Sequence, residues 1–251
     1  MRTTRRNLLK GSLLTALPMR AARSTRQEGV YQQLGLRPVI NCRGTHTVLG
    51  ASKKWPDLDA AMAEASRSFV LLEELQAAVG ERLARLIGSE AAMVTTGAAG
   101  AILLGTAAAL TGNDVKKVRQ LPNLEGMKTE AIIQKVHRNG YDHAVRNAGV
   151  KIIEVETREQ LEAAAGPRTA MLYFLGGTTG DWAWETPISL EECIAVGRRA
   201  GFPVLVDAAN MLPPWENLRK VAAAGAELIA ISGGKHMRGP QCSGILAGRK
   251  D

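Results

Sequence analysis

The sequence predicts an α/β protein with a mostly parallel sheet and helices on both faces. Short apolar runs alternate along the chain with longer segments whose apolar residues recur at helical spacing. Strand–helix alternation of this kind is typical of parallel sheets that are covered on both sides. A chain of 251 residues with 45% hydrophobic content is long enough to bury one sizeable core.

The elements follow from the spacing of the apolar residues and from the Gly, Ser and Asp residues between them. The expected strands cover residues 38–41, 91–95, 130–136, 151–156, 170–175, 204–206, 228–232 and 243–248. The expected helices cover residues 57–88, 101–110, 141–148, 158–165, 190–200 and 218–224. A tight turn is expected at 96–100. Ser189, with Glu191 and Glu192 behind it, favours a capped helix start.

Three polar residues fall at or just after the ends of expected strands: Thr95, Asp207 and Lys235. The carboxyl ends of parallel strands share one edge of the sheet, where ligands of such folds bind. We therefore expect these side chains to share one site.

Lys235 and Asp207 are the residues that carry chemistry. A lysine that bonds to an aldehyde, together with an aspartate that keeps a pyridine nitrogen protonated, is what a pyridoxal 5'-phosphate (PLP) enzyme needs. Taken singly, a surface lysine and a strand-end aspartate are both common. Their joint context, with Ser232 and Gly233–Gly234 before the lysine, favours a PLP site.

A phosphate cup is expected around the turn at 96–100. Thr95, Thr96, Gly97 and Ala98 let the backbone approach an anion, and free N–H groups at a helix start bind it. Ser232 can add a hydroxyl. Tight strand–helix packing explains the same glycines, and a strand-end cap explains the serine.

Three further side chains have two interpretations each. His137 follows an expected strand and is interpreted either as the residue that stacks on the cofactor ring or as a loop histidine. His236 and Arg238, next to the lysine, either meet an anionic group of the substrate or carry solvated loop charges.

Residues 1–26 carry seven basic and no acidic side chains, so they hold seven of the eight net positive charges. Thr4–Lys10 resembles a twin-arginine export signal, which predicts a periplasmic or exported protein. A disordered basic tail and a retained anchor are the alternatives, and the protein is cytoplasmic if the leader does not function. No apolar run is long enough for a membrane span. We expect a leader at 1–26, an arm at 27–56 and a cofactor-binding domain at 57–251.

The near-neutral remainder and the 4% aromatic content argue against nucleic-acid binding. The three cysteines have no metal-ligand spacing, so no metal site is expected.

The chain resembles the selenocysteine synthase-like branch of fold-type I PLP enzymes, which includes L-seryl-tRNA(Sec) selenium transferases and D-glucosaminate-6-phosphate ammonia-lyases. The resemblance runs from about Val30 to the C-terminus, and the lysine segment is its most specific part. The matching stretches are residues 34–41, 94–100, 141–146, 206–209 and 232–241.

The resemblance implies the large domain of a fold-type I transferase, with Lys235 as the Schiff-base lysine and Asp207 as the partner of the pyridine nitrogen. It places residues 95–98 and Ser232 near the phosphate. It also implies dimers or larger homo-oligomers that share active sites. Family members continue into a small C-terminal domain, which we expect to be missing after Asp251.

The expected function is a PLP-dependent lyase or transferase that removes an α-proton and eliminates a β-group from a small amino acid or amino sugar acid. Selenium transfer to an aminoacyl-tRNA is an alternative, against which the near-neutral charge counts. A truncated, non-catalytic PLP-fold protein is the third possibility.

Overall fold

The computed structural model describes residues 29–177 and 186–251. Contacts divide the chain into two compact units, residues 1–42 and 43–251. The described part of the first unit contains one short helix, α1 (Val30–Gln33). The leader predicted for residues 1–26 lies outside the described residues.

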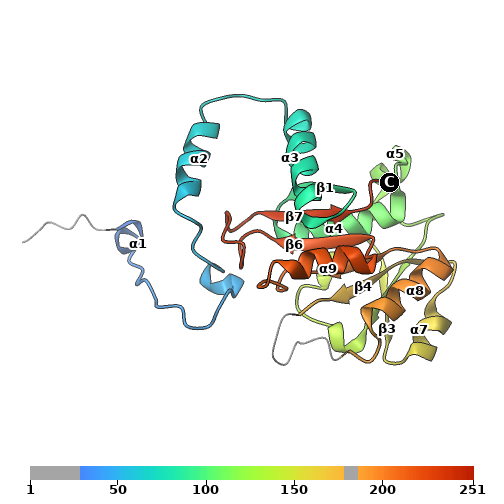
Figure 1. Cartoon of the computed structure of the whole chain (residues 1–251). Helices are drawn as coiled ribbons and strands as arrows, with labels where there is room; N and C mark the ends of the chain where they lie inside the picture. The colour runs from blue at the N-terminus through green and yellow to red at the C-terminus, as the bar shows by residue number, and fades with distance from the viewer. Residues whose placement is uncertain (1–28, 178–185) are drawn as a thin grey trace, which may run out of the picture. The chain divides into compact units, whose positions relative to one another are not determined.

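The second unit is built on a seven-stranded sheet in the order β1-β7-β6-β5-β4-β2-β3 (Figure 1). The strands are β1 (Ala91–Thr95), β2 (Glu130–Gln134), β3 (Lys151–Val155), β4 (Thr169–Leu175), β5 (Val204–Asp207), β6 (Leu228–Ser232) and β7 (Gly244–Gly248). All pairs from β3 to β6 are parallel, while β7 is antiparallel to both of its neighbours. The prediction of a mostly parallel sheet is confirmed.

Helices cover both faces of this sheet, as predicted. The helices of the second unit are α2 (Asp57–Ala65), α3 (Leu72–Ile87), α4 (Gly97–Thr111), α5 (Val115–Gln120), α6 (His143–Arg146), α7 (Arg158–Ala164), α8 (Leu190–Ala200) and α9 (Glu216–Ala224). Helices α4 and α6 pack on one face, and α3, α7, α8 and α9 pack on the other.

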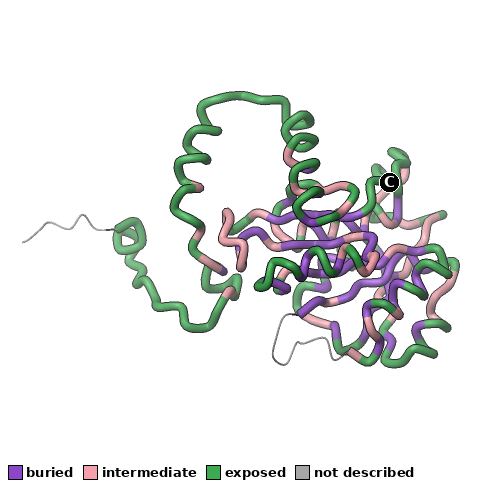
Figure 2. Tube along the Cα trace, in the orientation of Figure 1, coloured by how far each residue is buried: buried purple, intermediate pink, exposed green. Residues whose placement is uncertain are grey.

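The core therefore has two layers, and the strands divide their side chains between them. Tyr173 and Leu205 belong to the layer under α4, whereas Phe174 and Val206 belong to the layer under α8 and α9. Figure 2 shows that the buried residues follow the strands of the sheet. Because side chains alternate along a strand, Asp207 points to the α4 face, like Leu205.

Two predictions at the N-terminal side are wrong. Residues 38–41 form no strand, and no described strand pairs with them, so their backbone lacks the ladder that defines a strand. The helix predicted over 57–88 is two helices, α2 and α3, interrupted at residues 66–71. Ser66 begins the interruption, and its hydroxyl donates to the carbonyl of Ala63 at 2.9 Å, a local bond that competes with helix continuation.

Strand β1 has the predicted bounds, and the side chains of two of its residues are exposed. Met93 and Val94 are each 38% exposed because β1 lies at the edge of the sheet. The side chain of Gln76 in α3 bonds both backbone groups of Val94, at 3.0 and 3.1 Å. The free edge is thus partly capped by the helix that precedes it.

Other boundaries shift by a few residues. Helix α4 begins at Gly97, so the predicted turn at 96–100 is mostly helix. Strand β2 ends at Gln134 and continues as a 3-10 turn, Lys135–His137. Helix α5 was not predicted; its signal is Asp114, whose side chain accepts bonds from the backbone N–H groups of Lys116 and Lys117. The predicted cap at Ser189 is confirmed as a full capping box with Glu192.

Within the described residues, no helix combines the length and the apolar character needed to cross a membrane. The same residues contain no group of three metal-ligating side chains that could hold an ion.

Candidate active site

The site forms at the carboxyl edge of the parallel strands. Thr95, Asp207 and Ser232 are the last residues of β1, β5 and β6, and Lys235 follows β6 in a turn. Thr95 and Ser232 both pair with Gly244 at the start of β7, one from each side. The antiparallel insertion of β7 thus brings two hydroxyl-bearing strand ends to either side of one glycine.

Close backbone approach surrounds that glycine. A Cβ atom on Gly244 would collide with the backbone of Gly97 and lie 2.8 Å from the nitrogen of Ala98. The Thr95 hydroxyl donates to the carbonyl of Gly97 at 2.9 Å, which fixes the start of α4 against the strand end. The 95–98 segment and the neighbourhood of Ser232 therefore meet at the N-terminus of α4, where backbone N–H groups favour an anion.

Replacing Gly244 with alanine is expected to disrupt this junction. The added methyl group forces β7 away from the start of α4, because the atoms that it meets belong to the backbone and cannot rotate away. We expect a loss of stability of about 2 kcal/mol, within the 1–3 kcal/mol range of overpacked sites, seen as a lower midpoint in urea unfolding. Gly140→Ala is the matched control, since a Cβ there meets nothing within 4 Å. Equal midpoints for the two variants would contradict the proposed packing.

Asp207 is a buried carboxylate, 5% exposed. Its Oδ1 accepts the backbone N–H of Ala209 at 2.9 Å, and its Oδ2 accepts the hydroxyl of Tyr173 at 2.8 Å. Burial raises the pKa of Asp207 above its ordinary value, while these two hydrogen bonds and the positive charge of Lys235 oppose that rise. Both groups lie at the carboxyl edge of the sheet, Asp207 at the end of β5 and Lys235 in the turn after β6.

Lys235 is half-buried, and its Nζ lies 5.9 Å from the centre of the Tyr141 ring. Backbone bonds hold its turn: Gly233 donates to Ser243 at 2.9 Å, Gly239 donates to Gly233 at 2.8 Å, and Arg238 donates to Lys235 at 3.0 Å. A side chain on Gly234 would collide with the backbone of Gln241. The glycines before the lysine are thus required by close packing against residues 241–243.

A second segment, residues 52–55, is fastened to the lysine turn. Ser52 donates to the carbonyl of Gly234 at 2.8 Å, and the indole of Trp55 donates to the carbonyl of Met237 at 3.2 Å. Arg238 donates from Nε to the carbonyl of Lys53 at 2.9 Å, and its guanidinium lies 3.8 Å from the Trp55 ring centre. Arg238 therefore binds residues 53 and 55. The sequence had suggested either a substrate anion or solvent as its partner.

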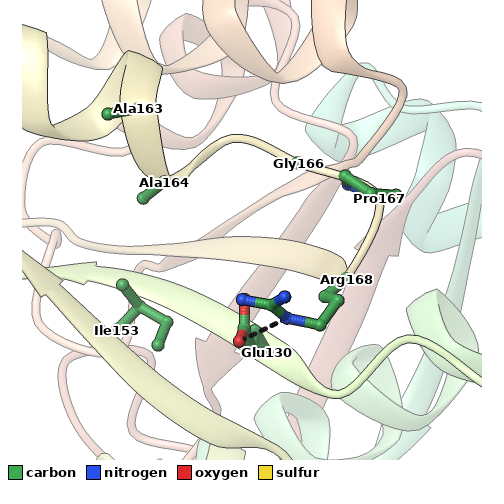
Figure 3. Close-up of a pocket in the computed structure, with 7 residues that line it drawn as sticks. All are labelled: Glu130, Ile153, Ala163, Ala164, Gly166, Pro167 and Arg168. Atoms are coloured by element: carbon green, nitrogen blue, oxygen red, sulfur yellow. Dashed lines mark hydrogen bonds and ion pairs between the residues drawn. The ribbon is translucent and has the colours of Figure 1, made fainter.

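A hollow of about 270 Å³ lies elsewhere, at the amino ends of the strands (Figure 3). It is lined by Glu130 at the start of β2 and by Arg168 before β4, which form an ion pair at 2.8 Å, and by five small or apolar residues. Catalytic groups of parallel sheets gather at the opposite edge, where Asp207 and Lys235 lie. We therefore assign the chemistry to that edge.

No protein-family model matches the chain. It is 34% identical over 230 residues to D-glucosaminate-6-phosphate ammonia lyase of Salmonella typhimurium, covering 88% of this chain and 60% of the relative. It is 35% identical to a 5'-C-glycyluridine monooxygenase-decarboxylase of Streptomyces sp., with coverages of 88% and 56%. The chain is also 28% identical to the L-seryl-tRNA(Sec) selenium transferase of Solidesulfovibrio magneticus, over 91% of this chain and 52% of the transferase.

The solved structure of D-glucosaminate-6-phosphate ammonia-lyase superposes with a TM-score of 0.81 at 33% identity, over 89% of this chain and 61% of that chain. The chain belongs to the selenocysteine synthase-like branch of fold-type I PLP enzymes. The chain spans between half and three fifths of the length of these curated relatives.

In this member of the branch, the ring of His137 lies between Phe174 and the backbone of Leu175 at the end of β4. Its ring packs edge-on against Phe174 at 4.6 Å, and its Nδ1 accepts the backbone N–H of Leu175 at 3.3 Å. Phe174 belongs to the α8 and α9 face of the sheet, whereas Asp207 points to the α4 face. Burial lowers the pKa of His137 to about 4, and its Nε2 has no partner among the described residues.

Three residues of the site are not predicted from the sequence. They are Tyr173, which binds Asp207, Tyr141, whose ring lies beside Lys235, and Asn139, which contacts Tyr173 at 3.4 Å. Tyr173 lies in the middle of an apolar strand, where an aromatic residue reads as core. The feature of the sequence that could have identified Tyr173 is a tyrosine within an otherwise apolar strand, because a buried tyrosine hydroxyl needs a hydrogen-bond partner.

Proposed function

We propose that the protein binds pyridoxal 5'-phosphate at this edge of the sheet. The observation that carries the proposal is a buried carboxylate, Asp207, whose pKa is raised by burial and which has a single cationic group, Lys235, acting on it among the described residues. A buried carboxylate is costly without a compensating charge. A pyridine nitrogen that carries a proton supplies that charge, so the donor set fits this cofactor.

Different side chains of the site bind the ring nitrogen, the phosphate and the aldehyde of the cofactor. Asp207 holds a proton at the pyridine nitrogen. The N-terminus of α4, with Thr95, Thr96, Gly97, Ala98 and Ser232, binds the phosphate. Lys235 Nζ would hold the cofactor at its aldehyde carbon, and as a free amine it would take the proton from the substrate α-carbon.

In this proposal, Tyr141 rather than His137 is the aromatic residue that faces the pyridine ring of the cofactor. Tyr141 is 49% exposed, and its ring is the aromatic group beside Lys235 Nζ. Its hydroxyl lies 3.5 Å from Thr47 Oγ1, so the ring is held from the side of residues 47–55.

We propose a lyase reaction on a small amino acid or amino sugar acid, by α-proton abstraction and elimination of a β-group. When bound, PLP supplies an electron sink for the pair left behind by the α-proton. The relationship to the ammonia lyase, at 34% identity, supports this reaction over selenium transfer, whose representatives share 27–29% identity. Residues 27–251 also carry almost no net charge, and tRNA binding relies on phosphate neutralisation.

Ammonia release tests this proposal. Protein purified with added PLP is expected to liberate ammonia from D-glucosaminate 6-phosphate or from a smaller 2-amino-3-hydroxy acid such as serine, with an absorbance band of bound cofactor in the visible range. Absence of ammonia from all these substrates in a protein that carries the band would contradict the lyase assignment. Transfer to seryl-tRNA(Sec) under the same conditions would replace it with the alternative.

We further propose that the protein forms homo-oligomers and is exported by the twin-arginine route. The exposed apolar residues Phe69, Val70, Leu71 and Leu72 support the first, and Arg5–Arg6 with the basic residues around them supports the second. A monomer in light scattering would contradict oligomer formation. Cytoplasmic retention of both the wild type and the Arg5→Lys/Arg6→Lys variant would contradict export.

A further inference from the structure

Tyr173 and Asp207 form a buried hydrogen bond between neighbouring strands. Tyr173 lies on β4 and is 0% exposed, and its hydroxyl donates to Asp207 Oδ2 at 2.8 Å. Leu175, two residues further along β4, pairs with Asp207 on β5, which places both side chains on the α4 face. A hydroxyl inserted into an otherwise apolar layer has to be satisfied by the groups around it.

Asn139 fixes the direction of this bond. Its Nδ2 donates to the Tyr173 hydroxyl oxygen at 3.4 Å and to the carbonyl of His137 at 3.0 Å. Its Oδ1 accepts the backbone N–H of Tyr141 at 2.7 Å. The Tyr173 oxygen thus accepts from Asn139, which leaves its own hydrogen for Asp207.

Few other charged groups bear on the pair. Lys235 acts on Asp207 from the turn after β6, and Asp142 acts on Tyr173 from the loop before α6. His236 stands next to Lys235 and is influenced by its charge. Four elements pack against β5 in the described part of the chain: α4, β4, β6 and α8. Helix α4 and strand β6 carry no titratable side chain, and β4 carries Tyr173 alone. Helix α8 carries Glu191, Glu192, Cys193, Arg198 and Arg199, but it packs on the face of the sheet opposite to α4 and Asp207.

Burial raises the pKa of Asp207, and a hydrogen bond donated to the carboxylate lowers it. Without the Tyr173 hydroxyl, Asp207 would take up a proton at a higher pH. A protonated Asp207 cannot compensate a positive pyridine nitrogen.

We propose that Tyr173 is a positioning residue for the pyridine nitrogen of the cofactor: its hydroxyl, held by Asn139, keeps Asp207 ionised and orients the carboxylate. This inference rests on the proposed function. It assigns to Tyr173 no contact with the cofactor or the substrate.

The test is the pH dependence of cofactor affinity in Tyr173→Phe. The probe is 4-deoxypyridoxine 5'-phosphate, which has the ring nitrogen and the phosphate but no aldehyde, so bonding to Lys235 does not enter. Protonation of the probe and of Lys235 affects both proteins alike and cancels in the ratio of their dissociation constants. We expect the variant to bind about tenfold more weakly at about pH 5, with a ratio near one at about pH 8.5.

Tyr141→Phe is the matched control, because it removes a phenol hydroxyl from the same site without touching Asp207. Its ratio to the wild type is expected to be independent of pH. Asn139→Ala is a second variant with an intact core, and it should show the same trend as Tyr173→Phe with a smaller amplitude. If Tyr173→Phe fails to fold, as judged by circular dichroism, Asn139→Ala decides the question.

The outcomes separate the two proposals. A wild-type protein that binds the probe, with a flat ratio for Tyr173→Phe or, failing that variant, for Asn139→Ala, would overturn the role of Tyr173 alone. A wild-type protein that binds neither the probe nor PLP at any pH would overturn the proposed function, and the role of Tyr173 with it.

Discussion

Lys235→Ala is expected to abolish covalent cofactor binding and at least 99.9% of ammonia release, about a thousandfold, since it removes the amine that is proposed to bond the aldehyde and to move the α-proton. The physical basis is the placement of Lys235 Nζ in a turn closed by backbone bonds on both sides, next to the Tyr141 ring. The absorbance band of the bound cofactor should disappear, and dialysis should remove all added PLP.

Lys220→Ala is the matched control for this loss. Lys220 is exposed on α9, which packs on the face of the sheet opposite to α4. This variant should keep the band and the activity of the wild type. A band of equal strength in Lys235→Ala would mean that another group binds the aldehyde, and the assignment of the lysine would be wrong.

Asp207→Asn is expected to have the second largest effect. The substitution preserves shape but removes the charge opposite the ring nitrogen. Breaking a buried charge pair costs about 3 kcal/mol or more, so PLP affinity should fall roughly a hundredfold at neutral pH. Ammonia release should fall further, because the ring then loses the proton that makes it an electron sink.

Asp114→Asn provides the comparison for Asp207→Asn. Asp114 is exposed and caps α5, and asparagine caps a helix equally well. Fluorescence titration with PLP measures both variants. Equal affinities of the two variants would show that Asp207 does not face the cofactor ring.

The sequence was sufficient for the features that depend on local pattern. The apolar runs that end in Thr95, Asp207 and Ser232 indicate strand ends, and parallel topology brings such ends to one edge of the sheet. The cap at Ser189 was equally local. Such signals need only neighbours in the chain.

The features that were missed depend on contacts between distant residues. Tyr173 becomes a site residue only through the register of β4 against β5, which apolar periodicity does not specify. The link between residues 52–55 and the Lys235 turn joins positions more than 180 residues apart. The packing of His137 against Phe174 depends on the 3-10 turn after β2, which apolar periodicity does not indicate.

Borohydride reduction of the wild-type protein with PLP, followed by peptide mapping, identifies the amine that binds the cofactor. We expect the peptide containing Lys235 to gain the mass of one reduced phosphopyridoxyl group, and the peptides containing Lys220 and Lys250 to remain unmodified. A label spread over surface lysines, or fixed on a lysine other than Lys235, would contradict the account.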